Sequence, residues 1–266
     1  MKIGFIGAGN MATAIIGGLL GADTAPSDIC VFDMDKEKLS YFASRGVTVC
    51  ADSCELTKTC DIGVLAVKPQ NYSEVISEIA SSSDENKTFV SIAAGITIDF
   101  VRRGLNLNVP VVRVMPNTPL LVGKGATALC FSSNVSDEAR EITTKMFSCS
   151  GVVAEFTEDK MDAIISVNGS SPAYFYLFAK AMADYAQSVG IDREDAMTLI
   201  CAAMEGSAEM LRSSGDDPDT LIKKVSSKGG TTIEALNKFY EHDLEGAVYD
   251  AMSACTKRAG ELAKEA

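Results

Sequence analysis

The stretch KIGFIGAGNMA, Lys2–Ala12, decides the fold of this 266-residue chain. An apolar run of strand length ends in a glycine turn, and a helical pattern follows it to Leu20. Gly7, Gly9 and Ala12 have the spacing G-x-G-x-x-A. The first glycine permits a tight turn, the second lets backbone approach a pyrophosphate, and the alanine allows close packing of helix on sheet. The stretch therefore predicts a dinucleotide-binding unit, with a ligand-free glycine turn as the alternative.

The second strand-like run, ICVFD, ends in Asp33. An acid about 20 residues after the glycine motif can accept hydrogen bonds from the adenosine ribose hydroxyls. A carboxylate there repels the 2′-phosphate of NADPH, although Lys36 is close enough in sequence to weaken the repulsion. We therefore expect NAD(P)H as the cofactor, and Asp33 favours NADH.

Strand and helix patterns alternate along the first half of the chain, which predicts a mostly parallel sheet covered by helices on both faces. The fold class is α/β, with a Rossmann-type doubly wound domain over residues 1–157 and an all-helical domain over residues 158–266. The expected strands are 2–6, 29–33, 47–50, 61–67, 88–94, 109–115, 125–131 and 151–156. The expected C-terminal helices are 159–168, 172–189, 193–212, 217–225, 232–241 and 243–264.

Two segments of the helical half are apolar nearly all round. Residues 173–183 contain one charged side chain, Lys180, and residues 196–204 contain none. A surface helix has one apolar stripe, so such segments are typical of buried helices. About 110 residues offer little volume in which to bury both. We therefore predict an intertwined dimer through residues 159–266, rather than a monomer.

The composition limits the partners. The formal net charge is −12, which repels nucleic acid and anionic lipid, so neither is expected. The apolar N-terminus is broken by five glycines before Leu20, which disfavours a signal peptide and predicts a cytoplasmic protein. No window reaches the ~18 unbroken apolar residues of a membrane span. Eight cysteines without CxxC spacing and a single histidine predict reduced thiols and no metal site.

Further candidate residues follow the later strands at the edge where parallel sheets bind their ligands. Lys68 is a candidate catalytic acid, or more simply a side chain that lies along the cofactor. Asn117 can meet a nicotinamide carboxamide or cap the backbone of its own turn, and both alternatives stay open. The small residues after the fifth strand allow backbone to approach a flat ring. The candidate cofactor-binding residues at this edge are Ala66, Val67, Lys68, Pro69, Ala93, Ala94, Gly95 and Asn117.

The stretch SSKGGTTIEAL, residues 226–236, interrupts the helical half. Thr231 and Glu234 have the spacing of a capping box, with threonine at the N-cap. That assignment leaves the Thr232 hydroxyl free, and it gathers the backbone N–H groups of Gly230, Thr231 and Thr232 at the positive end of a helix dipole. Such a group of donors can bind a carboxylate without arginine, as the charge of −12 requires; an ordinary helix start is the alternative.

In order and spacing, GFIGAGNMA, AVKPQ, AAGI, MPNTP, GSSPAY and SSKGGTTIEAL together resemble the pyrroline-5-carboxylate reductases over essentially the whole chain. The resemblance implies reduction of 1-pyrroline-5-carboxylate to L-proline with NAD(P)H, the last step of proline biosynthesis. It also implies a helical dimerisation domain, with dimers often assembled into a decamer.

The resemblance carries over residue by residue. It places Gly7, Gly9, Asn10 and Met11 in the dinucleotide loop, Ala66–Pro69 and Ala93–Gly95 around the ribose and nicotinamide, and Ser227, Gly229, Gly230, Thr231 and Thr232 at the substrate. The Thr232 hydroxyl then reaches the ring nitrogen as the one catalytic residue. The family usually has proline where this chain has Lys228, which removes a backbone constraint and adds a cation.

Two rival functions use the same front motif. A β-hydroxyacid dehydrogenase relies on a lysine with an asparagine one helical turn later, whereas here Lys160 precedes Asn168 by eight residues, on the wrong face. A dinucleotide-sensing regulator would bind the cofactor without turnover, and it has no need of a carboxylate site. Oxidation of NAD(P)H that depends on pyrroline-5-carboxylate separates these alternatives.

Overall fold

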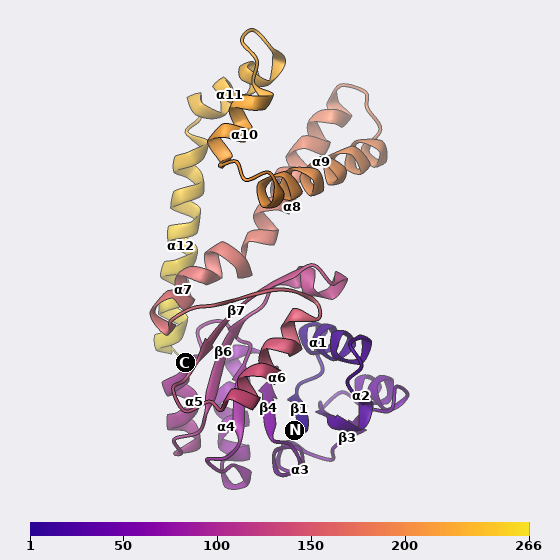
Figure 1. Cartoon of the computed structure of the whole chain (residues 1–266), viewed down its shortest axis with the longest axis vertical. Coiled ribbons are helices and arrows are strands. Elements are labelled where there is room, and N and C mark those ends of the chain that lie inside the picture. The colour runs from indigo at the N-terminus through magenta and orange to yellow at the C-terminus, as the bar shows by residue number, and fades with distance from the viewer. Residues whose placement is uncertain (266) are drawn as a thin grey trace. The chain divides into compact units, whose positions relative to one another are not determined.

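Within residues 1–265, short runs of β-branched and apolar residues form eight strands of one sheet, in the order β3-β2-β1-β4-β5-β6-β7-β8 (Figure 1). All neighbouring strands are parallel except β6 and β7, which run antiparallel. The expected mostly parallel sheet is confirmed. The strands are β1 (Ile3–Ile6), β2 (Ile29–Phe32), β3 (Thr48–Val49), β4 (Ile62–Leu65), β5 (Thr88–Ser91), β6 (Val111–Met115), β7 (Gly125–Phe131) and β8 (Gly151–Glu155).

The computed structural model describes residues 1–265, and the side chains as far as Ala263. Its contacts divide the chain into two units, Met1–Pro172 with Ala254–Ala266, and Ala173–Ser253. The predicted domain boundary between residues 157 and 158 stays a prediction, and residue 266 lies outside the described part. Within residues 1–265, no helix is long and apolar enough to cross a membrane.

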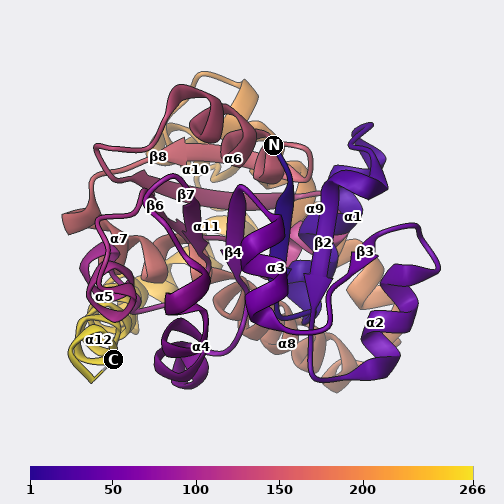
Figure 2. The ribbon, with the colours of Figure 1, turned by 90° about the horizontal axis from the view of Figure 1, so that it is seen from below.

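Strand residues alternate between the two faces of the sheet, as the period of a strand requires. Phe5 and Val31 belong to one buried cluster, whereas Ile6 and Cys30 belong to the other. The first cluster is completed by α1 (Asn10–Gly21), α2 (Lys36–Ala43) and α6 (Asp137–Ser148). The second is completed by α3 (Ser53–Thr59), α4 (Tyr72–Ile79) and α5 (Ile98–Leu105), which lie in a row (Figure 2).

The chain returns to the first unit at its C-terminal end. α7 (Met161–Ile164) leads into a π-helical turn, Ile165–Gly169, and the end of α12 (Leu244–Glu265) packs beside that turn. The Thr256 hydroxyl bonds that of Ser166 at 3.2 Å. Within β6, buried Arg113 forms ion pairs with Glu158 and Asp162, so α7 is held to the sheet by charge as well as by packing.

The second unit consists of helices: α8 (Ser171–Ser188) from Ala173 onward, α9 (Arg193–Ser213), α10 (Pro218–Val225), α11 (Thr231–Glu241) and the first half of α12. Small residues, among them Ala183 and Ala196, form its modest core between α8 and α9. Large apolar side chains of the two apolar segments are exposed in the single chain: Leu177 is 68% exposed and Leu199 is 70% exposed. An exposed surface of large apolar side chains, such as this one on α8 and α9, is typical of a protein interaction site.

Candidate active site

The first candidate region is the turn between β1 and α1. Gly7 has φ +102°, and a Cβ there would lie 2.7 Å from the carbonyl oxygen of Ala66, so only glycine fits between the ends of β1 and β4. Gly9 is the N-cap of α1; among the described residues, no side chain caps this helix and a Cβ on Gly9 would meet nothing within 4 Å. Open backbone donors at a helix N-terminus fit the pyrophosphate of a dinucleotide.

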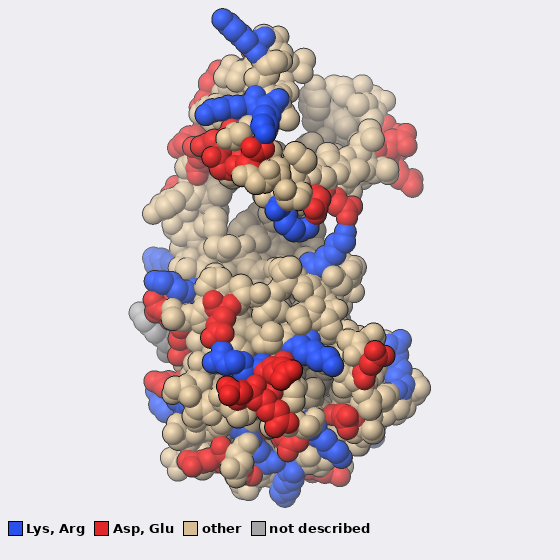
Figure 3. Space-filling view, viewed as in Figure 1, with Lys and Arg blue, Asp and Glu red and all other residues tan. Residues whose placement is uncertain are grey.

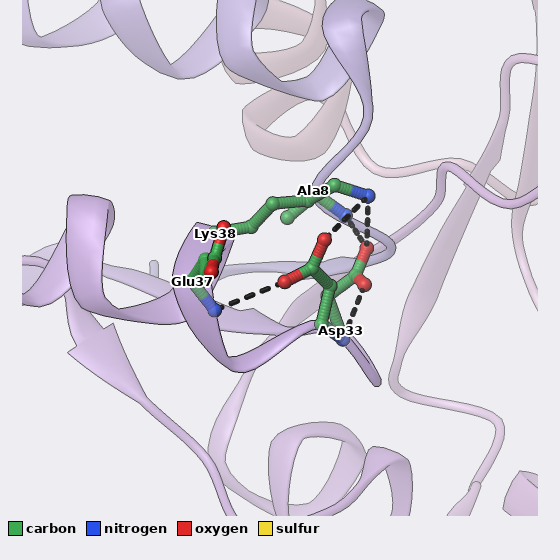
Figure 4. A network of polar contacts seen from close by, with 5 residues as sticks. Ala8, Asp33, Glu37 and Lys38 are labelled. Carbon is green, nitrogen blue, oxygen red and sulfur yellow. Dashed lines mark hydrogen bonds and ion pairs between the residues drawn. The ribbon is translucent and has the colours of Figure 1, made fainter.

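Asp33 follows β2 and contacts this turn (Figure 4). Its Oδ2 accepts a 2.7 Å hydrogen bond from the N–H of Ala8, and its Oδ1 accepts one of 2.8 Å from the N–H of Asp35. Lys38 Nζ lies 3.7 Å from Oδ2, and the Asp33 side chain is 16% exposed. Asp33 therefore holds the glycine turn, and Lys38, rather than the Lys36 considered from the sequence, is the cation paired with it. Remaining lone pairs of the carboxylate can accept ribose hydroxyls.

Residues after β4 and β5 extend this edge. Ala66 and Val67 are half-buried, while Lys68 is exposed and precedes Pro69 at the start of a 3₁₀ turn. Among residues 1–265, the Lys68 ammonium has no hydrogen-bond partner, so both of its predicted roles stay open. Tyr72, the first residue of α4, is buried, and its hydroxyl donates to the carbonyl of Leu65 at the end of β4. Burial raises the pKa of this phenol above its usual range, which keeps it a donor.

The small residues after β5 lie against the end of α12. Gly95 has φ +80°, and a Cβ there would come within 3.0 Å of the Leu262 Cβ. Ala93 is buried and Ala94 is half-buried beside it. The segment Ala93–Gly95 therefore needs small residues because the end of α12 packs against it, whether or not a cofactor also approaches it. Reasoning along the sequence could not find this contact, because it joins segments about 170 residues apart.

Asn117 is buried and bonded on both sides of its amide. Its Oδ1 accepts from the N–H of Ala126 at 2.9 Å, and its Nδ2 donates to Asn168 Oδ1 at 3.0 Å. Asn168 in turn donates to the carbonyls of Met115 and Ala126. The structure gives Asn117 a role in holding its loop to the π-helical turn, and its contact with a nicotinamide stays a prediction.

A second candidate region is the segment before α11, in the other unit of the chain. Gly229 has φ +75°, and the N–H of Gly230 donates to the carbonyl of Ser227 at 3.0 Å, which closes a tight turn. Gly230 is the N-cap of α11, and no side chain in the described part of the chain caps the helix. Thr231 and Thr232, both exposed, are its first two residues, and among residues 1–265 neither hydroxyl has a hydrogen-bond partner.

The predicted capping box is wrong. Thr231 lies inside the helix rather than at the N-cap, so Glu234 is its fourth residue rather than its third. The glycine turn is the reason, since it ends one residue earlier than expected and glycine is accepted at an N-cap almost as well as threonine. The N–H of Gly230 is also occupied within the turn, which leaves those of Thr231 and Thr232 as donors.

Known families and proteins match this chain along nearly its whole length. A family model of pyrroline-5-carboxylate reductase dimerisation matches residues 158–262, and one of NADP oxidoreductases, coenzyme F420-dependent, matches residues 2–95. The pyrroline-5-carboxylate reductase of Escherichia coli is 37% identical over 265 residues, which are 99% of this chain and 98% of the relative. The chain belongs to the pyrroline-5-carboxylate reductase family. It is accordingly an oxidoreductase, and the rival functions are not favoured.

Solved structures of the family agree over the full length. The enzyme from Coxiella burnetii has a TM-score of 0.90 at 32% identity and covers 98% of both chains. The pyrroline carboxylate reductase of Plasmodium falciparum, solved with NADP bound, also has a TM-score of 0.90, at 28% identity, with 99% of this chain and 98% of that chain covered. The dimerisation model over α7–α12 supports self-association of this chain through its helices.

Proposed function

We propose that this protein reduces 1-pyrroline-5-carboxylate to L-proline with NAD(P)H, the last step of proline biosynthesis. The observation that carries the proposal is the uncapped N-terminus of α11 behind a glycine turn, in a chain whose other unit has an open dinucleotide turn. Family membership over the whole length supports the same reaction.

The carboxylate of the substrate binds at the start of α11. The N–H groups of Thr231 and Thr232 donate to it, and each charge-assisted hydrogen bond contributes ~1.5–3 kcal/mol. The dipole of α11 adds ~0.3–1 kcal/mol. Gly229, with its positive φ, and Ser227, which accepts from Gly230, hold the backbone in the turn that exposes these donors.

Thr232 acts on the imine. Its hydroxyl donates to or shares a hydrogen bond with the ring nitrogen and so favours the protonated imine, while no side chain serves as a strong base. Bound NAD(P)H supplies the hydride for the imine carbon. The protein otherwise orients the two rings and excludes other geometries. His242, the single histidine, is the C-cap of α11, at the opposite end of the helix from Thr232.

The cofactor is bound by the turn around Gly7 and Gly9, with Asn10 and Met11 in the first turn of α1. The segments Ala66–Pro69 and Ala93–Gly95 flank the ribose and nicotinamide, and Asn117 lies at the same edge. Asp33 accepts the ribose hydroxyls and disfavours a 2′-phosphate, so NADH is preferred over NADPH. The Plasmodium falciparum relative was solved with NADP bound, and titration of NADH and NADPH tests the preference of this chain.

Three further points remain proposals. The chain forms dimers through residues 159–266, which can assemble further into a decamer; light scattering after gel filtration measures that assembly. The domain boundary lies between residues 157 and 158. The protein is cytoplasmic, which fractionation of cells that express it tests.

Initial rates with purified protein test the proposed function. NAD(P)H should be oxidised only when pyrroline-5-carboxylate is added, and L-proline should appear in equal amount. Oxidation of NAD(P)H with a β-oxo acid instead, reduction of NAD(P)+ with a β-hydroxyacid, or binding of NAD(P)H without turnover of the imine would contradict it.

A further inference from the structure

Lys228 is the residue of the substrate segment that the proposed function leaves without a role. Its side chain is exposed, and among residues 1–265 it has no ion pair or hydrogen-bond partner. Figure 3 shows basic side chains beside acidic ones over α10 and α11, and two of the four lysines of this region form ion pairs. Lys224 binds Asp216 at 2.5 Å, and Lys238 binds Glu241 at 2.6 Å. Lys228 is therefore a free cation next to the proposed site.

The turn fixes where this cation lies along the chain. The hydrogen bond from Gly230 to Ser227 makes Lys228 and Gly229 the two central residues of a four-residue turn. A positive φ at the second central position is the mark of a type II turn, in which proline is favoured at the first. Lys228 occupies that first position, two residues before the N-cap of α11. At this position the chain has the charged side chain of Lys228 instead of a proline ring, which would restrict the backbone.

The whole protein opposes the approach of an anion. The net charge of −12 repels both a carboxylate substrate and a dinucleotide, and the two donors at the start of α11 carry no net charge. Lys223, in the last turn of α10, is the other exposed lysine of this region without an ion pair in the described part of the chain. It is five residues from Lys228 and offers a matched control.

We propose that Lys228 attracts and positions the carboxylate of the small cyclic imine, and so lowers KM for that substrate. This inference rests on the proposed function, because it assumes that the carboxylate binds at the start of α11. The effect belongs to binding and not to hydride transfer, since the ammonium lies on the flexible side chain of an exposed residue. Lys228 is accordingly a positioning residue for an anionic substrate.

The test is KM and kcat for pyrroline-5-carboxylate at two ionic strengths, because the Debye length falls from about 30 Å at 0.01 M to about 3 Å at 1 M. Lys228→Gln should raise KM about two- to fivefold at 0.01 M, as expected for an exposed charge pair, and less than about 1.5-fold at 1 M. The values of kcat and of KM for NADH should not change. Lys228→Arg should retain the wild-type KM, and Lys228→Pro should behave like the glutamine variant.

Other outcomes overturn the inference. One is an unchanged KM for Lys228→Gln at low salt, and another is a rise in KM of equal size at both salts. A third is an equal rise in KM for Lys228→Arg, which would indicate that turn geometry matters instead of charge. An equal rise in KM for Lys223→Gln would assign the effect to the general field of the surface and also contradict a specific role. Failure of the proposed function is distinguishable, since the wild type would then show no oxidation that depends on pyrroline-5-carboxylate.

Discussion

Replacing Asp33 by asparagine should shift the cofactor preference toward NADPH. An amide has the shape of the carboxylate and keeps one oxygen that can accept from the N–H of Ala8, now at 2.7 Å from Oδ2. The substitution therefore removes the charge and leaves the glycine turn in place. A serine is too short to keep that bond, so Asp33→Ser should also weaken NADH binding.

The size of the shift follows from the charges around Asp33. Two unit charges about 4 Å apart interact by ~4 kcal/mol at an effective dielectric constant of about 20. Lys38, with its Nζ 3.7 Å from Oδ2, and the two N–H donors offset part of this repulsion. A net penalty of ~1.4–2.8 kcal/mol on a 2′-phosphate corresponds to about 10- to 100-fold. Lys38→Met should increase the penalty, because it removes the offsetting cation.

The assay is kcat/KM for NADH and for NADPH at saturating pyrroline-5-carboxylate, in the wild type and in these variants. The ratio of the two values should move toward NADPH by about 10- to 100-fold in Asp33→Asn. A change below about twofold would refute the reasoning, as would a strong preference of the wild type for NADPH.

The remaining predictions concern catalysis and stability. Thr232→Ala should lower kcat/KM for the imine about tenfold or more, while Thr231→Ala, one residue away, should change it far less; equal losses would remove the role of the Thr232 hydroxyl. Arg113→Met should lower the free energy of unfolding in urea by about 2–3 kcal/mol, below the ~3–5 of a fully buried pair because its partners are about a third exposed. Arg140→Met, at an exposed pair, should cost less than ~1 kcal/mol, and similar values for the two arginines would contradict the buried role. Burial raises the pKa of the Cys50 thiol from 9.0 to about 12, so the thiol ionises at a lower pH in the unfolded chain than in the folded one. The free energy of unfolding should therefore fall as the pH rises from 9 toward 12. Cys50→Ala should make this dependence on pH weaker.

The sequence predicted the sheet well because its strands are short apolar runs between turn residues. Each predicted strand overlaps the observed one, with ends that differ by up to three residues, as for 88–94 against Thr88–Ser91. Two short helices, α3 and α5, were not predicted. Their capping signals are present: Asp52 accepts from the N–H of Glu55, and Thr97 accepts from that of Phe100. Length is not the reason, because α10 also has eight residues and was predicted as 217–225; these two caps were not interpreted as helix starts.

The candidate site was predictable where a local motif determines it, and not where distant segments meet. The positions of Gly7 in the turn after β1 and of Asp33 directly after β2 could be predicted from spacing alone, and their roles toward a cofactor stay predictions. The bond between Asn117 and Asn168, and the packing of Leu262 on Gly95, join residues far apart in the chain. The error at Thr231 has another origin, since adjacent glycines and threonines are all acceptable at an N-cap and only the turn geometry decides between them.

The measurement that tests the central claim most directly is the loss of NAD(P)H absorbance with and without pyrroline-5-carboxylate, together with quantification of L-proline. The account predicts oxidation only with the imine present, one proline for each NAD(P)H consumed. Oxidation that is independent of the imine, or consumption of the imine without formation of proline, would contradict it.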